Sequence, residues 1–238
     1  MQEKVRNPSQ KSKWISRIFG LIIVVLIGAI GYELWAKPYV MGYIVRQSEV
    51  SVTPSHKSVD PNDKTITYGD SNTAISSLWE LLEHRNGAGT LLARGTISVP
   101  LQDGVYTPIN TTIFEGSSNY VLAYGAGTIK PDQKMGTGNY VIGAHNVADN
   151  TSLFSPLQTQ IDVTKKPKAY LSDGQNVYTY QLNSWDRVSR TTHGLVADKE
   201  NQKPKLTLIT CYLEYPNFYD AQDRVVVTGD LVDVKSIK

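Results

Sequence analysis

A single cysteine, Cys211, is the side chain best suited to nucleophilic chemistry in this chain of 238 residues. It closes the run Lys205–Cys211, whose residues alternate between two faces as they do in a half-buried strand. We therefore expect the thiol at the end of a rigid element, where a scaffold can present a reactive group. In an exported protein a lone thiol has no internal disulfide partner, so it is incidental, intermolecular or reactive.

Two further residues with useful chemistry, His145 and Arg224, also stand at the ends of apolar runs. A histidine near the thiol can act as acid and base. A guanidinium favours the thiolate and can donate to an oxygen that becomes negative during acyl transfer. Taken alone, His145 also fits a half-buried, hydrogen-bonded strand end, and Arg224 fits a solvated charge or a partner of Asp220 or Asp223. The spacing permits a catalytic group but does not establish one.

The remaining histidines carry weaker signals. His56 lies in a proline-containing polar stretch, and His84 is interpreted as a favourable charge near the end of a helix. His193 lies in a polar loop and is a candidate for contact with a substrate. The histidines and the cysteine are scattered, without the close pairs of zinc sites, so no metal site is predicted. Gly125–Gly127 precedes no helical run and is interpreted as a turn.

The N-terminal region predicts a membrane anchor. Residues 18–36 are apolar apart from Glu33, which is close to the length of about 20 residues that spans a bilayer. Five cations and one acid precede it within residues 1–17, which predicts a single-pass protein with a cytoplasmic N-terminus and an extracellular catalytic domain. A cleaved signal peptide is the alternative, but Glu33-Leu-Trp35 is a poor cleavage site.

The net charge of +2 belongs to this N-terminal region. Five of the 24 basic residues and two of the 22 acids lie ahead of residue 37, which leaves 19 and 20, a balance near −1. Nothing in this balance suggests a nucleic-acid partner.

The rest of the chain predicts one all-β domain behind a polar stalk. Residues 37–70 lack periodicity and are interpreted as an extracellular stalk, and residues 71–238 as the catalytic domain. Apolar residues at helical spacing predict a helix over 71–86 that covers one end of a barrel over 93–238. Short β-rich runs between turn signals predict seven or eight strands in a barrel or sandwich. They are Gly95–Leu101, Thr107–Phe114, Asn139–His145, Lys168–Leu171, Val177–Trp185, Lys205–Cys211 and Arg224–Val234, with a short helix at Ser152–Gln160.

Several motifs together resemble the class A sortases, the membrane-anchored cysteine transpeptidases of Gram-positive bacteria. The sequence TLITC ends at Cys211, DRVVVTGDL contains Arg224, and GAHN contains His145. Supporting segments are GAGTIKPDQ at 125–133, MGTGNY at 135–140, IFEGSSN at 113–119 and FSPL at 154–157. The resemblance covers roughly residues 93–234 and includes three catalytic positions in the order His, Cys, Arg.

The resemblance implies an eight-stranded sortase-type β-barrel with short helices, preceded by the N-terminal transmembrane helix. It implies that Cys211 attacks the Thr–Gly bond of an LPXTG-type sorting signal (Leu-Pro-X-Thr-Gly) to form a thioester. His145 then acts as acid and base, and Arg224 holds the substrate and stabilises the oxyanion. The resemblance also implies a set of substrate-binding positions, namely Thr210, Ala126, Thr128 and Ile209.

The implied partners are LPXTG-bearing exported proteins and an amine of lipid II or of a peptidoglycan cross-bridge. Some class A sortases are activated by calcium bound to a cluster of acids. Asp132 stands without a matching cluster in this sequence, so we expect no cofactor and no dependence on calcium. The segment 185–204, where such enzymes read the sorting signal, does not align residue by residue.

Three other interpretations fit less well. A papain-like peptidoglycan hydrolase places cysteine before histidine and carries the cysteine on a helix, whereas here His145 comes first. A class C sortase usually carries an Asp-Pro-aromatic lid, and Asp60-Pro61-Asn62 lacks the aromatic residue. A non-catalytic, wall-binding barrel with an incidental thiol is the remaining alternative.

Overall fold

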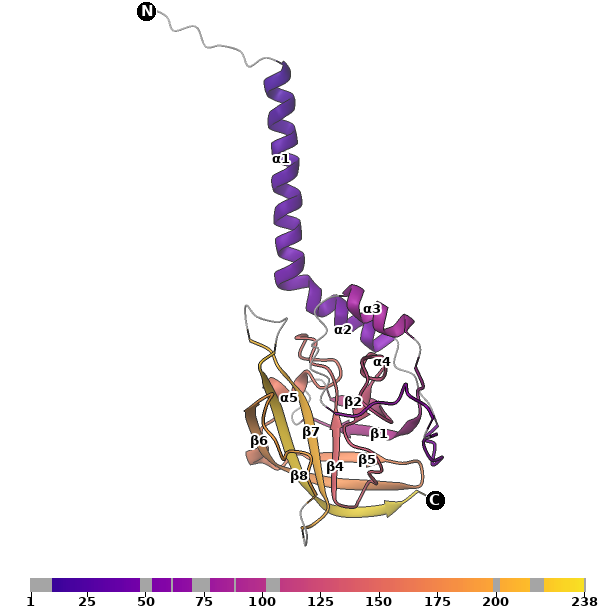
Figure 1. The fold of residues 1–238 in the computed structure, drawn as a ribbon. Coiled ribbons are helices and arrows are strands. Elements are labelled where there is room, and N and C mark those ends of the chain that lie inside the picture. The colour runs from indigo at the N-terminus through magenta and orange to yellow at the C-terminus, as the bar shows by residue number, and fades with distance from the viewer. Residues whose placement is uncertain are drawn as a thin grey trace, which may run out of the picture. The chain divides into compact units, whose positions relative to one another are not determined.

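A computed structural model describes residues 10–47, 53–60, 62–69, 78–87, 89–101, 108–198, 202–214 and 221–237. The chain divides into two compact units, Met1–Val40 and Met41–Lys238. The first unit is helical, and the second contains a β-barrel with short helices (Figure 1).

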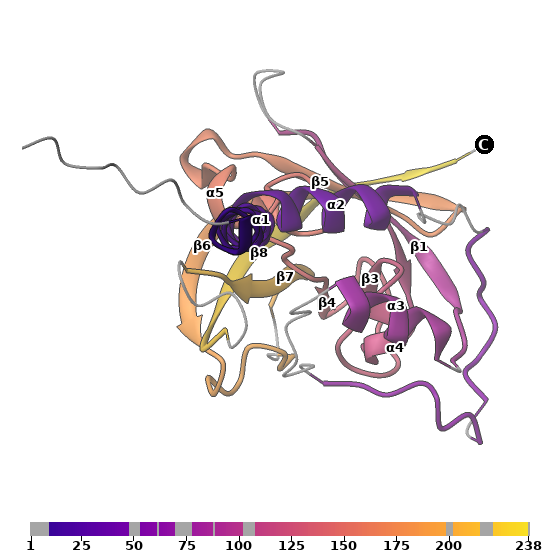
Figure 2. The same ribbon diagram turned by 90° about the horizontal axis from the view of Figure 1, so that it is seen from above.

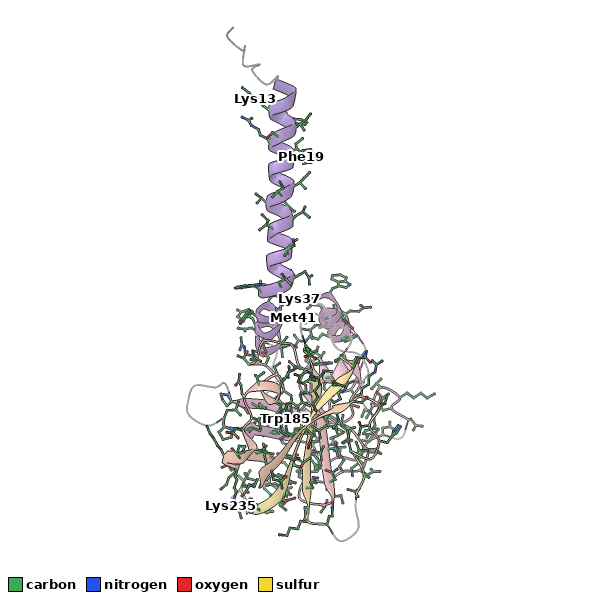
Figure 3. The ribbon with its side chains drawn as sticks, turned by 90° about the vertical axis from the view of Figure 1, so that its left-hand side faces the viewer. Lys13, Phe19, Lys37, Met41, Trp185 and Lys235 are labelled. Carbon is green, nitrogen blue, oxygen red and sulfur yellow. The ribbon has the colours of Figure 1, made fainter. Side chains whose placement is uncertain are left out.

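The first unit is dominated by helix α1 (Gln10–Gly31), which continues through a π-helical turn at Tyr32–Ala36 into α2 (Lys37–Gln47). Apolar side chains such as Phe19 radiate from α1 and are exposed (Figure 3). At 1.5 Å per residue the 22 residues of α1 extend about 33 Å, which matches a bilayer core of about 30 Å. The helix is thus long and apolar enough to cross a membrane.

The region expected to be a polar stalk, residues 37–70, is structured where it is described. Met41 and Val45, one turn apart on α2, are buried in the core of the second unit. Ser152 Oγ donates to the carbonyl of Gly42 (3.2 Å), on the same helix. Further along, the Ser55 amide donates to the Ala93 carbonyl at 2.7 Å. An apolar helical stripe and backbone pairing therefore attach much of this region to the barrel.

The second unit is built on a closed barrel in the order β1-β2-β3-β4-β7-β8-β6-β5 (Figures 1 and 2). The pairs β2–β3 and β4–β7 are parallel and the other pairs are antiparallel. The expected eight-stranded barrel is confirmed. Its strands are β1 (Ala93–Val99), β2 (Ile109–Phe114), β3 (Ala126–Thr128), β4 (Asn139–Gly143), β5 (Lys168–Ser172), β6 (Asn176–Ser189), β7 (Lys205–Tyr212) and β8 (Asp223–Ser236).

Successive side chains along the strands point alternately into the barrel and away from it, which determines which of them form the core. On β7, Leu206 and Leu208 join the main core inside the barrel, whereas Ile209 belongs to a separate apolar cluster with Val226 of β8. Val225 and Val227 of β8 point into the main core. This part of β8 is therefore buried on both of its faces.

The helices of the second unit are short. Helix α3 (Leu78–Asn86) forms the described part of the helix predicted over 71–86, and residues 70–77 lie outside the described residues. The predicted helix at 152–160 is reduced to α5 (Pro156–Thr159). Helix α4 (Asn119–Leu122) was not predicted. Its N-cap is Ser118, whose hydroxyl accepts from the Val121 amide at 3.3 Å.

The interpretation of Gly125–Gly127 as a turn was wrong, because Ala126–Thr128 is strand β3. A Cβ at Gly127 would lie 2.2 Å from the Gly116 carbonyl oxygen, and one at Gly125 would lie 2.6 Å from that of Thr112. These glycines allow close backbone approach within the barrel. A strand of three residues, one of them Gly127, carries too little periodicity to be predicted.

We predict that Gly95→Ala destabilises the barrel. A Cβ at Gly95 would lie 2.1 Å from the Ser172 carbonyl oxygen, at the β1–β5 seam that closes the barrel. Relief of this clash requires a backbone shift, so the free energy of unfolding should fall by about 1–3 kcal/mol. Denaturant unfolding of the full chain in detergent measures this. Thr96→Ser, at the exposed next position, is the control, and an unchanged midpoint in Gly95→Ala would contradict the prediction.

Candidate active site

Three sequence-predicted residues, His145, Cys211 and Arg224, line one small cavity of about 20 Å³ at one end of the barrel. Each comes from a different strand end: His145 follows β4, Cys211 is the penultimate residue of β7, and Arg224 is the second residue of β8. Ile209 and Thr210 line the same cavity. The three strand ends therefore meet at one cavity.

Strand register brings these residues together. In the antiparallel pair β7–β8, Cys211 and Arg224 are direct partners. In the parallel pair β4–β7, Gly143 is the partner of Ile209, and the Ala144 amide donates to the Ile209 carbonyl at 3.2 Å. His145 and Cys211 each follow this last pair by two residues, so they arrive at the same level of the barrel.

His145 is 3% exposed, and its Nε2 makes no hydrogen bond to any described residue. Burial lowers the pKa of His145 to about 4, because a charged imidazolium loses hydration inside the protein. A positive charge on His84 lowers this pKa further, and the negative charge of Glu80 raises it. At neutral pH the resting imidazole is therefore uncharged.

The end of β7 is attached to the chain after His145 by two amide side chains. Asn146 Nδ2 donates to the Cys211 carbonyl (3.0 Å) and to Gln158 Oε1 (2.7 Å). Gln158 also bonds both backbone groups of Leu213, at 2.7 and 2.9 Å. Sequence reasoning missed Asn146 and Gln158, although Asn146 belongs to the quoted GAHN motif. These bonds restrict the position of the thiol relative to the imidazole.

Thr210, predicted as a substrate-binding residue, lines the cavity next to Cys211. Its hydroxyl donates to the Ala144 carbonyl at 2.7 Å. This bond joins β7 to the residue before His145, so Thr210 also fixes the spacing between the two strand ends.

Arg224 is buried, with 2% of its surface exposed, so it is not the solvated charge that sequence alone allows. Its Nη1 donates to the carbonyls of Ala221 (2.9 Å) and Asp223 (3.2 Å). The Asp223 carboxylate instead accepts from Arg187 Nε at 2.6 Å. Asp220, the other suggested partner, lies outside the described residues. Backbone carbonyls thus hold the guanidinium at the cavity wall.

A second cavity of about 210 Å³ adjoins the first, since Ile129, Ile209 and Arg224 line both. Its apolar wall includes Leu195 and Val196, from the segment between β6 and β7. His193 lines this cavity as well. The two cavities together form a groove that leads to Cys211 and that suits an extended chain with apolar side chains.

Two predicted substrate-binding residues do not line either cavity. Ala126 is fully buried in the main core. The Thr128 hydroxyl donates to Glu115 Oε1 (3.1 Å) and accepts from the Gly116 amide (2.7 Å). Both side chains are occupied within the barrel, so the structure assigns them to its stability.

The segment between β6 and β7 is held against the rest of the barrel by a lysine. Asp198 accepts from Lys130 Nζ and from the Asn139 amide, both at 2.7 Å. These hydrogen bonds lower the pKa of Asp198 below its usual value, the amide being the larger cause. Within the described ranges, no three His, Cys, Asp or Glu side chains are grouped to hold a metal ion.

We predict that His145 makes the stability of the fold depend on pH. Its pKa rises from about 4 in the folded state to an ordinary value near 6.5 on unfolding. The unfolded chain therefore binds the proton more readily, and stability falls as pH drops from 6.5 towards 4, by up to about 3 kcal/mol. Melting curves of wild type and His145→Gln should diverge across this window, with His193→Gln as the control. Parallel curves for wild type and His145→Gln would contradict the prediction.

Comparison with known proteins agrees with this geometry. A family model for the sortase domain matches residues 100–232. Sortase A of Streptococcus agalactiae serotype III is 32% identical to this chain over 237 residues, covering 95% of this chain and 90% of that protein. Sortase A of Listeria monocytogenes is 28% identical over 213 residues, covering 88% of this chain and 90% of that protein.

The fold comparison leads to the same family. A solved structure of Listeria monocytogenes sortase A superposes with a TM-score of 0.52 at 28% identity, covering 61% of this chain and 91% of that one. The family model spans more than half of the present chain, and one relative exceeds 30% identity over nearly its whole length. The chain therefore belongs to the sortase family and is a sortase transpeptidase.

Proposed function

We propose that this sortase cleaves an LPXTG-type sorting signal between Thr and Gly through a Cys211 thioester and transfers the protein to a cell-wall amine. The observation that carries the proposal is the shared cavity of His145, Cys211 and Arg224. Nucleophile, acid–base and oxyanion stabiliser are the three groups that acyl transfer through a thioester needs.

In the proposed mechanism the thiol gives its proton to the neutral imidazole of His145, and the thiolate attacks the Thr carbonyl carbon. Negative charge develops on the carbonyl oxygen, and Arg224 donates to it. The His145 imidazolium then protonates the departing glycine amine, which leaves a thioester on Cys211. The lowered pKa of His145 makes its imidazolium a better proton donor than an ordinary imidazolium for that step.

Resolution of the thioester uses the same residues in reverse. An incoming amine attacks the thioester, His145 takes the proton that the amine loses, and Cys211 leaves as the thiolate. The product is a new amide that joins the exported protein to the acceptor. An amine from lipid II or from a peptidoglycan cross-bridge outcompetes water only if it is positioned, which is an effect of effective concentration.

The groove beside the cavity supports a peptide substrate. Ile209, Leu195 and Val196 offer an apolar surface for the Leu and Pro side chains of the signal. The adjoining Arg224 lies where the Thr–Gly carbonyl would reach Cys211. We propose Ile209 and Thr210 as substrate-contacting positions and assign no such role to Ala126 or Thr128.

The N-terminal helix fits a membrane anchor, and we propose that it spans the membrane once. The five cations before residue 18 favour a cytoplasmic N-terminus, which places the catalytic domain outside the cell. Sorting signals and lipid-linked precursors meet at the outer membrane face, so tethering raises their effective concentration at the active site.

We also propose that the enzyme works without calcium. The Lys130–Asp198 ion pair and the Asn139 amide bond already attach the β6–β7 segment to the barrel. Lys130 Nζ already supplies a positive charge beside Asp198.

A transfer assay tests the proposed function. The full chain in detergent is incubated with an LPXTG-type peptide and an acceptor amine, either oligoglycine or a diamino acid, and the products are identified by mass. We expect transfer by wild type, none by Cys211→Ala or His145→Ala, and severe loss in Arg224→Lys, because an ammonium lacks the planar guanidinium fork. His193→Ala, in the groove wall, should change substrate preference at most.

Three outcomes of this assay would each contradict part of the proposal. An uncleaved peptide with every acceptor tested would exclude LPXTG transpeptidation. Cleavage without transfer would indicate a hydrolase. Wild-type turnover by Arg224→Lys would show that the guanidinium geometry is unimportant.

We predict that chelation leaves activity unchanged and that Lys130→Ala reduces it. Excess EDTA should change kcat/KM by less than about twofold. Loss of the ion pair should free the β6–β7 segment and lower kcat/KM about tenfold, which corresponds to about 1.4 kcal/mol. Lys134→Ala, an exposed lysine in the same loop, is the matched control. Inactivation by EDTA that calcium reverses would contradict the prediction.

A further inference from the structure

A larger cavity, of about 640 Å³, lies at the opposite end of β4 from the catalytic cavity. Tyr140, the second residue of β4, lines this larger cavity, whereas His145 follows the last residue of the same strand. Among the described residues, the larger cavity shares none of its lining with the catalytic groove. Its volume lies in the range of roughly 300–1,000 Å³ that is usual for sites of small organic ligands. The proposed transfer reaction makes no use of it.

Arg94 is held at the wall of this cavity with part of its guanidinium unused. Its Nε donates to Glu115 Oε2, and its Nη1 donates to the carbonyls of Ser55 (2.9 Å) and Lys57 (2.6 Å). The remaining nitrogen, Nη2, makes no hydrogen bond to any residue that the structure describes. Because three bonds already fix the planar guanidinium, Nη2 can bind a ligand with little further loss of side-chain freedom.

Tyr140 supplies a second unused polar group. Its side chain is only 2% exposed and lines the cavity, yet its hydroxyl has no hydrogen-bond partner within the described ranges. Buried hydroxyls are nearly always hydrogen-bonded, since the loss of hydration is otherwise uncompensated. Burial raises the pKa of Tyr140, and the negative charge of Glu115 raises it further, so the hydroxyl keeps its proton and can donate. Tyr178, in the same wall, instead donates to Asp173 Oδ2 at 2.9 Å.

Two acids of the cavity wall are already satisfied within the protein. Glu115 accepts from Arg94 and from two hydroxyl groups, at 2.8 and 3.1 Å. Asp173 accepts from two backbone amides, at 2.8 and 2.7 Å, and from the Tyr178 hydroxyl. The unused groups deep in this cavity are therefore hydrogen-bond donors, which suit a ligand that accepts.

The charges of the described lining favour a ligand with a single negative charge. Three cations and three acids line the cavity, so its formal charge is balanced and offers no excess of positive charge to a dianion. A carboxylate carries one negative charge on two oxygens, which matches one guanidinium nitrogen and one phenol as donors. The cations are Lys57, Arg94 and Lys134, and the acids are Glu115, Asp132 and Asp173.

We propose that this cavity binds the carboxylate of a small organic ligand, with Arg94 Nη2 and the Tyr140 hydroxyl donating to its oxygens. The volume leaves room for an organic group behind the carboxylate. Two kinds of ligand carry this chemistry, the C-terminus of a peptide and a free organic acid. The site is separate from Cys211, so the proposal does not depend on the transfer reaction.

The test is a titration of the full chain in detergent, followed by NMR of the ligand protons. The probes are N-acetyl-Ala-Ala with a free carboxylate, the same dipeptide as its C-terminal amide, and acetate. We expect the dipeptide acid to bind about tenfold more tightly than the amide, because only the acid offers a charged acceptor. Tyr140→Phe, which keeps the ring, should weaken binding of the acid by a similar factor. Tyr170→Phe, on β5 and outside the lining, is the matched control.

A further variant separates this site from the catalytic cavity, where another arginine could attract a carboxylate. Arg224→Gln should leave the affinity for the dipeptide acid unchanged, and loss of binding in this variant would overturn the proposal. Equal affinities for acid and amide would also overturn it, as would an affinity that Tyr140→Phe leaves unchanged. If Tyr140→Phe lowers Tm, the comparison of acid with amide on wild type and on Arg224→Gln decides the question.

The remaining probes identify the kind of ligand. Acetate that binds as tightly as the dipeptide acid would support the site and indicate a free organic acid. Tighter binding of the dipeptide acid would support the site and indicate a peptide C-terminus. Inorganic phosphate is the competing anion, and its displacement of the dipeptide acid at equal concentration would overturn the assignment of the site to a carboxylate.

Discussion

The site depends on the hydrogen-bonded pairing of β7 with its two neighbours. β7 runs parallel to β4 and antiparallel to β8. The pairing with β4 extends to Gly143 and Ile209, and the pairing with β8 extends to Tyr212, the last residue of β7. These registers place Cys211 opposite Arg224 and level with His145. A slip of one residue in either pairing would turn a catalytic side chain to the other face of the sheet. The bonds of Thr210 and Asn146 reinforce this alignment where the ladder ends.

Burial of the site has opposite effects on its two basic residues. Arg224 is held by backbone carbonyls, which compensate the loss of hydration of a permanently charged group. Nε2 of His145 makes no hydrogen bond to a residue that the structure describes, and burial keeps this imidazole neutral at rest. A neutral imidazole can accept the thiol proton. Because burial lowers its pKa, the resulting imidazolium gives up that proton more readily than an ordinary imidazolium. The burial that keeps His145 uncharged at rest therefore also favours proton transfer from its imidazolium to the leaving amine.

Much of this architecture could be predicted from the sequence because its signals are local. Alternation identified β7, and the motifs around His145, Cys211 and Arg224 indicated the family. Strand β3 could not be predicted, since its three residues, which include Gly127, carry no periodicity. Helix α2, at the start of the expected stalk, was not predicted. Its apolar face becomes evident only from the surface against which Met41 and Val45 are buried.

The contributions of the amide side chains of Asn146 and Gln158 required tertiary structure. His84, interpreted as a charge near the end of a helix, lies in the last turn of α3. Ala126 and Thr128 are part of a matching motif, yet their side chains serve the core and the Glu115 network.

The central claim is that Cys211 carries the acyl group. Mass analysis of the full chain, incubated with an LPXTG-type peptide without an acceptor amine and then quenched in acid and digested, tests it most directly. The account predicts that the fragment containing residue 211 gains the mass of the peptide up to its Thr, and that hydroxylamine releases this group as a hydroxamate. Peptide cleavage with an unmodified Cys211, or with the acyl group on another residue, would contradict it.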